Sequence, residues 1–301
     1  EKFSIKNISE GFGCNYYKPN NQKDFEDILL SSSKIKGTKV IELNYKNSDY
    51  SKFKSIDDEI DVIFHLAGQS GGYRSLIEHE LDLDWNAKGT LNICMFAKER
   101  SINKIIYTSS MAVYGEGDWL KETDELHPIS NYGVSKLYGE ICLKQFSQYD
   151  IDYTIFRVFN TYGTGQNLTN GRQGVVAVFV AQAIKGNIIN VTGSLDRYRD
   201  LTYIDDTVNA LVYGLKDHTS KQTYNICSKI KITIREIIDM VICASGRTSN
   251  SFVVNNIGKH DGDQFGNTGD NYKLLGLGWK PNVTLSEGIK KFYKYSEGVL
   301  K

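Results

Sequence analysis

The sequence predicts an α/β fold in which parallel strands alternate with helices. Three apolar runs have the length of strands: "DVIFHLAG" (61–68), "KIIYTSS" (104–110) and "DYTIFRVFN" (152–160). Between them, residues 81–101 and 131–150 place apolar side chains at three- and four-residue spacing, which is the helical period. Strands that alternate with helices of this length form βαβ units and a parallel sheet with right-handed crossovers. We therefore predict a Rossmann-like domain.

After residue 170 the predicted elements are shorter and more mixed. We expect helices in "GVVAVFVAQAIKGN", in "TIREIIDMVICASG" and near residues 286–296, and short strands in "IINVTG" and "QTYNIC". This pattern indicates a smaller, mixed α/β part that binds substrate. We place the Rossmann-like domain at residues 1–170 and the second part at 171–301.

The charges and cysteines exclude several classes of function. Lys plus Arg number 36 and Asp plus Glu number 36, without a long block of either sign, which does not suit binding to nucleic acid or to an anionic membrane. The five cysteines are scattered without the spacing of metal ligands, so we expect reduced thiols, no metal and a cytoplasmic location. No apolar run approaches the ~20 residues of a membrane span. We expect a soluble protein with a small-molecule substrate.

The stretch "ISEGFGCN" at residues 8–15 raises the question of a phosphate-binding loop. Such a loop needs glycines where a buried strand turns into a helix, because a residue without Cβ lets a pyrophosphate reach the helix N-terminus. Here only Gly11 and Gly13 are present, and the preceding "FSIKNI" alternates apolar and polar residues. We interpret this stretch as a surface turn and not as a sound phosphate loop.

Tyr132 and Lys136 form a Y-x-x-x-K pattern that points to acid/base chemistry. A spacing of four places both side chains on one face of the predicted helix. Free tyrosine titrates near ~10, so a base at neutral pH needs a pKa lower by about 3, and a neighbouring ammonium is one way to lower it. Tyr50 and Lys54 have the same spacing but lie in a polar stretch without a strand, where a solvated surface is the better interpretation.

Ser110 is the third candidate for catalysis. It ends the strand "KIIYTSS", so its hydroxyl lies at the carboxyl edge of a parallel sheet, where α/β folds bind their ligands. We expect this hydroxyl to bind a substrate oxygen; a simple capping role for the serine is the alternative.

Several motifs together resemble one family. They are "DVIFHLAG", "NAKGTLNI", "YTSSMAVYG", "NYGVSKLYGE", "FRVFNTYGTGQ", "RDLTYIDD", "YNIC" and "LGWKP". From about residue 39 to the C-terminus, the sequence resembles the extended short-chain dehydrogenases/reductases, in the branch of nucleotide-sugar epimerases and dehydratases that includes UDP-galactose 4-epimerases.

The resemblance implies a role for individual residues. Ser110, Tyr132 and Lys136 would form the catalytic group, with NAD as the cofactor and a nucleotide sugar, UDP- or GDP-linked, as the substrate. The residues implied to bind NAD, besides Tyr132 and Lys136, are Asn44, Leu66, Ala67, Gly68 and Asn86, with His65 beginning that loop. Those implied to bind substrate, besides Ser110, are Asn160, Arg199, His260, Asp263 and Asn267.

Three of the implied substrate residues carry more specific expectations. His260 stands where the family has an arginine that clamps phosphate, and a neutral imidazole would hold phosphate more weakly. Asp263 would bind the ribose of the nucleoside. Asn267 stands where some UDP-galactose 4-epimerases carry a large aromatic residue, so its smaller side chain would leave room for an N-acetyl group at C2.

The N-terminal part departs from the family pattern. The family opens with a strand, a G-x-x-G-x-x-G loop, a helix and a second strand with an acidic end. Here the first strand of that kind is "TKVIELN" (38–44), and Asn44 replaces the acidic residue. We expect the first cofactor-binding βα unit to be missing or degenerate. A fragment explains this better than a loss of NAD binding, since the catalytic group is retained.

The residues after Ser110 limit which of the family's reactions this chain is expected to catalyse. Family dehydratases carry an Asp-Glu pair there, whereas this chain has Met111 and Ala112, which cannot transfer a proton. The cysteine and histidine used by epimerases that act at C3 and C5 are not matched either. Reversible oxidation at C4, that is C4 epimerisation, remains. Two alternatives stay open: net oxidation or reduction by the same residues, and a cofactor-free binding protein. The resemblance also implies a homodimer through helices 81–101 and 131–150.

Overall fold

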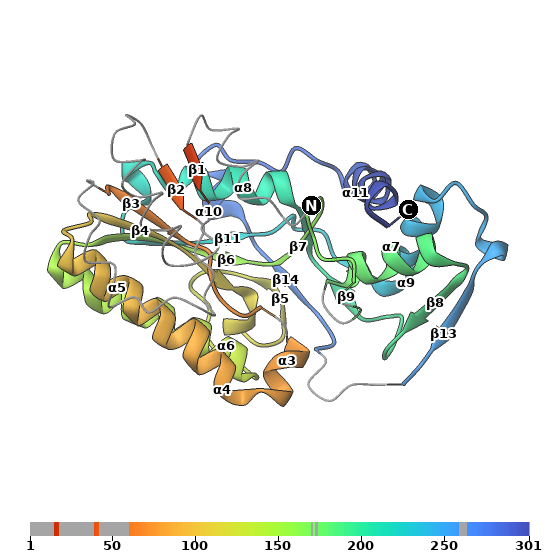
Figure 1. Cartoon of the computed structure of the whole chain (residues 1–301), viewed down its shortest axis with the longest axis horizontal. Helices are drawn as coiled ribbons and strands as arrows, with labels where there is room; N and C mark the ends of the chain where they lie inside the picture. The colour runs from red at the N-terminus through yellow and green to blue at the C-terminus, as the bar shows by residue number, and fades with distance from the viewer. Residues whose placement is uncertain are drawn as a thin grey trace.

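The computed structural model describes most of the chain and arranges it around a central parallel sheet (Figure 1). The described residues are 15–17, 39–41, 60–70, 72–169, 171, 174–258 and 264–300. The four strands of the sheet are β3 (Val62–His65), β4 (Lys104–Ser110), β6 (Asp152–Val158) and β11 (Gln222–Ile226). They pair in the order β11-β6-β4-β3, all in parallel. The predicted α/β fold with a parallel sheet is confirmed.

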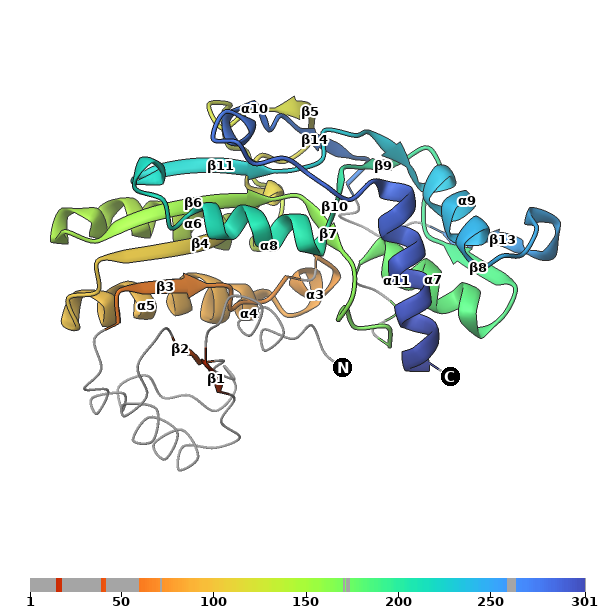
Figure 2. The same cartoon turned by 90° about the horizontal axis from the view of Figure 1, so that it is seen from above.

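The central strands form where they were predicted because both faces of the sheet are covered. On one face, Ile105 packs with residues of α5 (Gly89–Glu99) and α6 (Asn131–Phe146). On the other face, Ile106 packs with residues of α8 (Ile204–Tyr213) and α10 (Tyr272–Leu275) (Figure 2). A strand buried on both faces reads as a continuous apolar run, which is the signal that predicted β4.

The predicted helix over 81–101 is interrupted. It consists of α4 (His79–Asp82), a π-helical turn η3 (Leu83–Lys88) and α5. A short helix, α3 (Gly72–Ile77), precedes α4. The extra residue of a π turn changes which side chains face the sheet, and such turns often lie at functional sites.

The C-terminal elements form a second core beside the sheet. The predicted helices are present as α7 (Val175–Lys185), α9 (Ile234–Ala244) and α11 (Leu285–Leu300), and one large apolar cluster joins them. A capping box between Thr233 and Glu236 starts α9. The strand predicted in "QTYNIC" is β11, which belongs to the central sheet and not to this smaller core.

Most remaining strands are short and pair two by two. They are β1 (Asn15–Tyr17) with β2 (Lys39–Ile41), β7 (Asn160–Tyr162) with β10 (Leu201–Tyr203), β8 (Ile188–Val191) with β13 (Val253–Asn256), β9 (Tyr198–Arg199) with β12 (Ile232–Thr233), and β5 (Gly117–Leu120) with β14 (Asn267–Gly269). The strands predicted in "TKVIELN" and "IINVTG" correspond to β2 and β8. The strand β1 was not predicted, and Gly11 and Gly13 lie outside the described residues.

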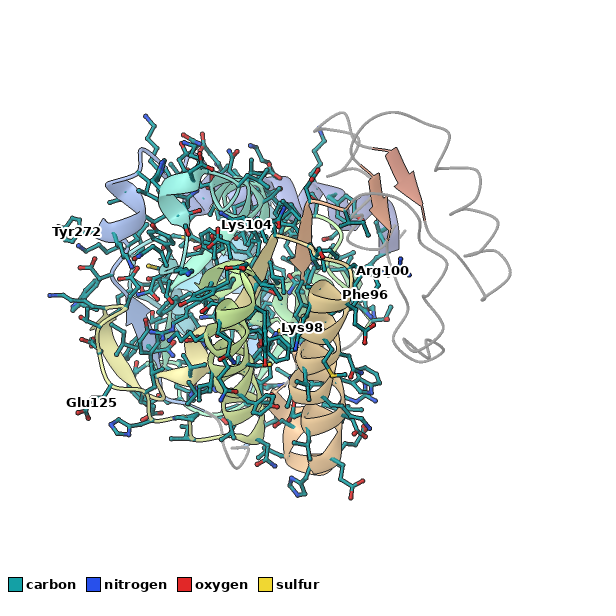
Figure 3. The ribbon with its side chains drawn as sticks, turned by 90° about the vertical axis from the view of Figure 1, so that its left-hand side faces the viewer. Phe96, Lys98, Arg100, Lys104, Glu125 and Tyr272 are labelled. Atoms are coloured by element: carbon teal, nitrogen blue, oxygen red, sulfur yellow. The ribbon has the colours of Figure 1, made fainter. Side chains whose placement is uncertain are left out.

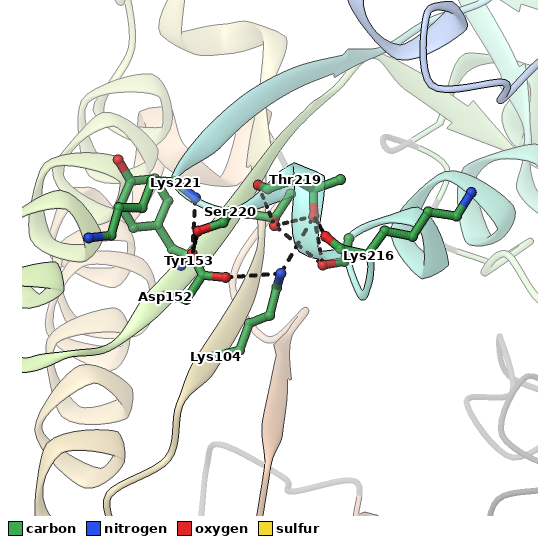
Figure 4. Close-up of polar contacts among 9 residues, drawn as sticks. Lys104, Asp152, Tyr153, Lys216, Thr219, Ser220 and Lys221 are labelled. Atoms are coloured by element: carbon green, nitrogen blue, oxygen red, sulfur yellow. Dashed lines mark hydrogen bonds and ion pairs between the residues drawn. The ribbon is translucent and has the colours of Figure 1, made fainter.

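A polar cluster joins the amino ends of the central strands (Figure 4). Lys104, the first residue of β4, lies 3.0 Å from the Asp152 carboxylate of β6. Asp152 also accepts hydrogen bonds from Ser220 and from the backbone of Lys221, just before β11. This cluster stabilises the amino edge of the sheet. The side chains of the candidate site lie at the opposite, carboxyl edge.

Candidate active site

Ser110 and Tyr132 meet at the carboxyl edge of the sheet. Ser110 is the last residue of β4 and caps the 3-10 turn η4 (Met111–Val113), where the Ala112 amide donates to Ser110 Oγ at 3.2 Å. The Ser110 hydroxyl also lies close enough to the Tyr132 phenol to lower its pKa. Since Ser110 accepts from Ala112, its own proton is available to a phenolate or to a substrate oxygen.

The first turn of α6 carries Tyr132 and is fixed at its start. Ser130 caps the helix by accepting from the Gly133 amide at 3.1 Å. The Tyr132 amide donates to Ser75 Oγ at 3.0 Å, which ties α6 to α3. A Cβ at Gly133 would collide with the Ala112 carbonyl, so glycine lets α6 approach the turn that follows Ser110.

The electrostatics of Tyr132 and Lys136 differ from the expectation. Burial raises the pKa of the Tyr132 phenol, and the neighbouring Ser110 hydroxyl opposes this only in part. Burial lowers the pKa of Lys136 to about 8, and its Nζ donates to the Thr108 carbonyl at 2.9 Å. The expected lowering of the Tyr132 pKa by Lys136 is therefore wrong for the free protein, because the ammonium turns to a backbone carbonyl and the phenol is desolvated.

The loop after β3 presents its backbone beside Lys136. Leu66, Ala67 and Gly68 are exposed there. Gly68 has φ +150°, and a Cβ at this position would lie 2.5 Å from Asn86 Oδ1 and 3.6 Å from Lys136 Nζ. Only glycine lets the Asn86 side chain pack this closely against the loop backbone next to Lys136.

Asn86 holds this loop from the π-helical turn. Its Oδ1 accepts from the Gln69 amide at 2.8 Å, and its Nδ2 donates to the Gln69 carbonyl at 3.1 Å and to Ser135 Oγ at 3.0 Å. One buried side chain thus connects the loop after β3 with α6. This position fits the supporting role that the resemblance implies.

His65 is buried beneath the same loop. Its Nε2 lies 2.9 Å from Thr90 Oγ1, and its ring stacks on Tyr107 with centroids 5.3 Å apart. Burial, with the nearby Lys136, lowers the pKa of His65 to about 3. The imidazole is therefore neutral at physiological pH.

On the substrate side, Asn160 and Arg199 lie on two short strands. Asn160 begins β7, and its Nδ2 donates to the Asp200 carbonyl at 3.2 Å and lies 3.7 Å from Met111 Sδ. Arg199 Nη1 donates to the Tyr198 carbonyl at 2.7 Å, and burial, with Arg197 nearby, lowers the pKa of Arg199 to about 10. The half-buried Arg199 near the buried Arg197 suits an anionic ligand.

Asn267 is not part of a surface turn. Its side chain lies in β14, is 1% exposed, and donates to the Gly115 carbonyl at 3.3 Å. The residues Asn44, His260 and Asp263 lie outside the described part of the chain.

The sequence interpretation missed two neighbours of the site. Asp82 is a buried carboxylate one helical turn before Asn86, and Ser75 accepts from the Tyr132 amide. The D-x-x-x-N spacing of Asp82 and Asn86 was a visible signal, since residues four apart share a helix face. Ser75 had no such signal.

Three further properties come from the described residues. None of the helices there is long and apolar enough to cross a lipid bilayer. The same part of the chain contains no group of three or more His, Cys, Asp or Glu that could hold a metal ion. Its four cysteines, Cys94, Cys142, Cys227 and Cys243, are free thiols.

A parallel sheet with Ser, Tyr and Lys gathered at its carboxyl edge defines a Rossmann-like enzyme of the dehydrogenase/reductase type. Comparison with known sequences makes this specific: the chain belongs to the NAD-dependent epimerase/dehydratase family, whose profile matches residues 15–227. The match begins earlier than the motifs indicated, since we placed the start of the resemblance at about residue 39.

Three similar proteins illustrate the range of the family. A putative UDP-glucose 4-epimerase of Methanocaldococcus jannaschii is 30% identical over 77% of this chain and 76% of its own length. A dTDP-4-dehydro-6-deoxyglucose reductase of Escherichia coli is 31% identical over 78% of this chain and 74% of its own length. The crystal structure of a UDP-glucose 4-epimerase from Thermotoga maritima with UDP-glucose has a TM-score of 0.82 at 25% identity and covers 99% of this chain and 95% of that one.

NAD is the cofactor of this family, and the described residues fit its nicotinamide end. The exposed loop residues Leu66, Ala67 and Gly68 lie at the carboxyl edge of β3, with Lys136 Nζ beside Gly68. Dinucleotides bind at this edge in Rossmann-like sheets. Asn86 would keep the loop in place, while Tyr132 and Lys136 would face the ring.

Proposed function

We propose that this chain is an NAD-dependent nucleotide-sugar 4-epimerase. The observation that carries the proposal is the position of Ser110 at the carboxyl end of β4 beside Tyr132, with Lys136 one turn further along α6. Met111 and Ala112, which follow Ser110, offer no acid or base for dehydration. We also propose that residues 1–170 bind NAD and that 171–301 bind the nucleotide sugar, apart from β11, which returns to the sheet.

In this proposal, each residue of the group has a defined task. Ser110 donates a hydrogen bond to the O4 oxygen of the sugar, and Tyr132 takes the proton from that hydroxyl. The Lys136 ammonium stabilises the negative charge on the phenolate. NAD, when bound, supplies the site that accepts a hydride from C4 and returns it. If the keto sugar turns its other face before the return, Tyr132 gives the proton back to an inverted O4.

The test is direct conversion of a nucleotide sugar. The purified protein with added NAD is incubated with UDP-hexoses and GDP-hexoses, and the configuration at C4 is followed by proton NMR. We expect inversion at C4 without net formation of NADH. If neither nucleotide series is converted while the protein binds NAD, the proposal is wrong.

A reductase is the second candidate, and the similarity to the Escherichia coli reductase favours it. Both reactions use the same proton transfer at O4, so the site geometry does not separate them. A reductase consumes reduced cofactor in proportion to product, whereas an epimerase recycles its hydride. The absorbance of reduced cofactor during turnover distinguishes the two, and an absence of NAD binding would favour a binding protein.

The sugar pocket is proposed to accept an N-acetyl group at C2. The resemblance places Asn267 where a larger aromatic excludes such groups, and in the structure this side chain is small and buried. Extra volume in a pocket changes selectivity only modestly, so we expect kcat/KM for UDP-N-acetylglucosamine within about tenfold of that for UDP-glucose. Steady-state kinetics on both substrates checks this. Turnover of UDP-glucose alone would contradict it.

We propose a homodimer formed by α5 and α6, which stand side by side (Figure 3). Their outer faces expose large apolar side chains: Met95 is 46%, Tyr138 41% and Ile141 49% exposed. An apolar stripe on two neighbouring helices suits a four-helix bundle with a second copy.

For the dimer we expect Ile141→Asp to be monomeric, because the change places a charge in the middle of the apolar stripe. Light scattering at micromolar concentration checks both forms. A wild-type protein that is strictly monomeric at that concentration would exclude the proposed interface.

A further inference from the structure

Asp82 is a buried carboxylate near the reacting residues that the proposed mechanism does not use. It ends α4, at the start of the π-helical turn, and its residue is 1% exposed. A buried carboxylate is costly unless it is hydrogen-bonded or faces a positive charge. The hydrogen-bond partners of Asp82 therefore indicate what this carboxylate does.

The hydrogen-bond partners of Asp82 come from the loop after β3 and from the π-helical turn. Its Oδ1 accepts from Gln69 Nε2 at 3.0 Å, in the loop after β3, and from Asn86 Nδ2 at 3.3 Å. The same Asn86 amide also donates to Ser135 Oγ of α6 at 3.0 Å. Asp82 thus joins the loop after β3 to the π-helical turn and, through Asn86, to α6.

We propose that Asp82 is a positioning residue, which fixes Asn86 and the loop after β3 next to the Lys136 ammonium. The inference rests on the proposed function, because it assigns Asp82 to the same reacting group. Asp82 touches neither the sugar nor the reacting atoms; it acts through Lys136 and Tyr132.

The groups that surround the Lys136 ammonium are uncharged, so the Asp82 carboxylate can act as its negative charge. The groups that face it are the Thr108 carbonyl and the Tyr107 ring of β4, the neutral His65 of β3, and Tyr132 on its own helix. None of these carries a negative charge in the free protein.

The pKa of Lys136 is lowered to about 8. Burial causes this lowering, and the negative charge of Asp82 partly opposes it. Asp82 also raises the pKa of Tyr132. The other titratable group facing Asp82 is His79 of α4. Loss of the carboxylate charge should therefore lower the pKa of both Lys136 and Tyr132.

The first measurement needs no sugar substrate. The carbon next to the amine is labelled in all lysines, and the Lys136 signal is assigned by its loss in Lys136→Arg. In Asp82→Asn, which keeps an oxygen acceptor for Gln69 and Asn86, we expect the pKa of Lys136 to fall from about 8 to about 7. The matched control is Asp84→Asn, an exposed carboxylate two residues away, which should leave the Lys136 pKa unchanged.

The second measurement is the pH dependence of kcat/KM for the nucleotide sugar. We expect both limbs of the profile to move to lower pH in Asp82→Asn, which a loss of packing alone would not cause. Asp82→Glu, which keeps the charge, should restore the Lys136 pKa to about 8. If Asp82→Asn does not fold, Asp82→Ser gives the same comparison.

An unchanged Lys136 pKa in a folded, charge-free variant would overturn the inference. If the wild-type protein converts no nucleotide sugar, the lysine titration still decides the role of Asp82. The two proposals therefore fail by different observations.

Discussion

Replacing Tyr132 with phenylalanine is expected to lower kcat of the proposed epimerisation by about 10²- to 10⁴-fold, the range for loss of a general base. The change removes only one hydroxyl, and the hydrogen bond from the Gly133 amide to Ser130 still fixes the first turn of α6. We therefore expect the fold to be retained. Initial rates from the NMR assay, with circular dichroism as a check of the fold, give the measurement.

The control for this variant is Tyr50→Phe. Tyr50 and Lys54 have the same four-residue spacing as Tyr132 and Lys136, but they do not follow a strand that ends in "TSS". We expect Tyr50→Phe to retain the wild-type kcat. Equal, small effects of both changes would remove Tyr132 from the role of base.

The main features of the fold were predictable because they depend on burial. The strand at 104–110 is buried on both faces and therefore reads as an almost continuous apolar run. The helix at 131–150 was predicted from its period, and its helical part ends at Phe146. Right-handed connection of such units then left few topologies.

The π-helical turn Leu83–Lys88 could not be predicted from the period. One extra residue in a turn changes the apolar spacing by less than the variation among ordinary helices, so the segment read as one helix. The turn matters because it carries Asn86, whose side chain holds the loop after β3. Short pairs such as β7 with β10 were missed because two or three residues show no period, and their partners lie about forty residues apart.

In the candidate site, too, the features set by local spacing were predictable, and those set by contacts between elements were not. The Y-x-x-x-K spacing correctly placed Tyr132 and Lys136 on one helix, and the strand end placed Ser110 beside them. The spacing did not tell where the Lys136 ammonium points, because the Thr108 carbonyl that accepts it comes from another strand. Spacing defines a helix face, whereas pKa values depend on every element packed around that face.

A buried ion pair directly behind the catalytic strand gives the largest expected effect on stability. Arg157 of β6 forms two hydrogen bonds with Glu140 of α6, at 2.9 Å and 2.8 Å, and both side chains are almost fully buried. Ser109, the neighbour of Ser110 in β4, donates to the same carboxylate at 2.6 Å. This pair therefore connects the strand of Ser110 with the helix of Tyr132.

We expect Glu140→Gln to lower the free energy of unfolding by about 3–5 kcal/mol, because the change leaves the Arg157 charge buried without its counterion. Urea denaturation followed by circular dichroism measures this. The control is Glu125→Gln, an exposed carboxylate near His127 at the edge of the molecule (Figure 3), for which we expect a change within about 0.5 kcal/mol. In the double variant Glu140→Met with Arg157→Met, no charge is left unpaired, so we expect much of the loss to be recovered. An unchanged stability of Glu140→Gln would contradict this expectation, because Arg157 would then have another counterion or water. The link between Ser110 and Tyr132 would in that case depend on the packing of α6 against β4.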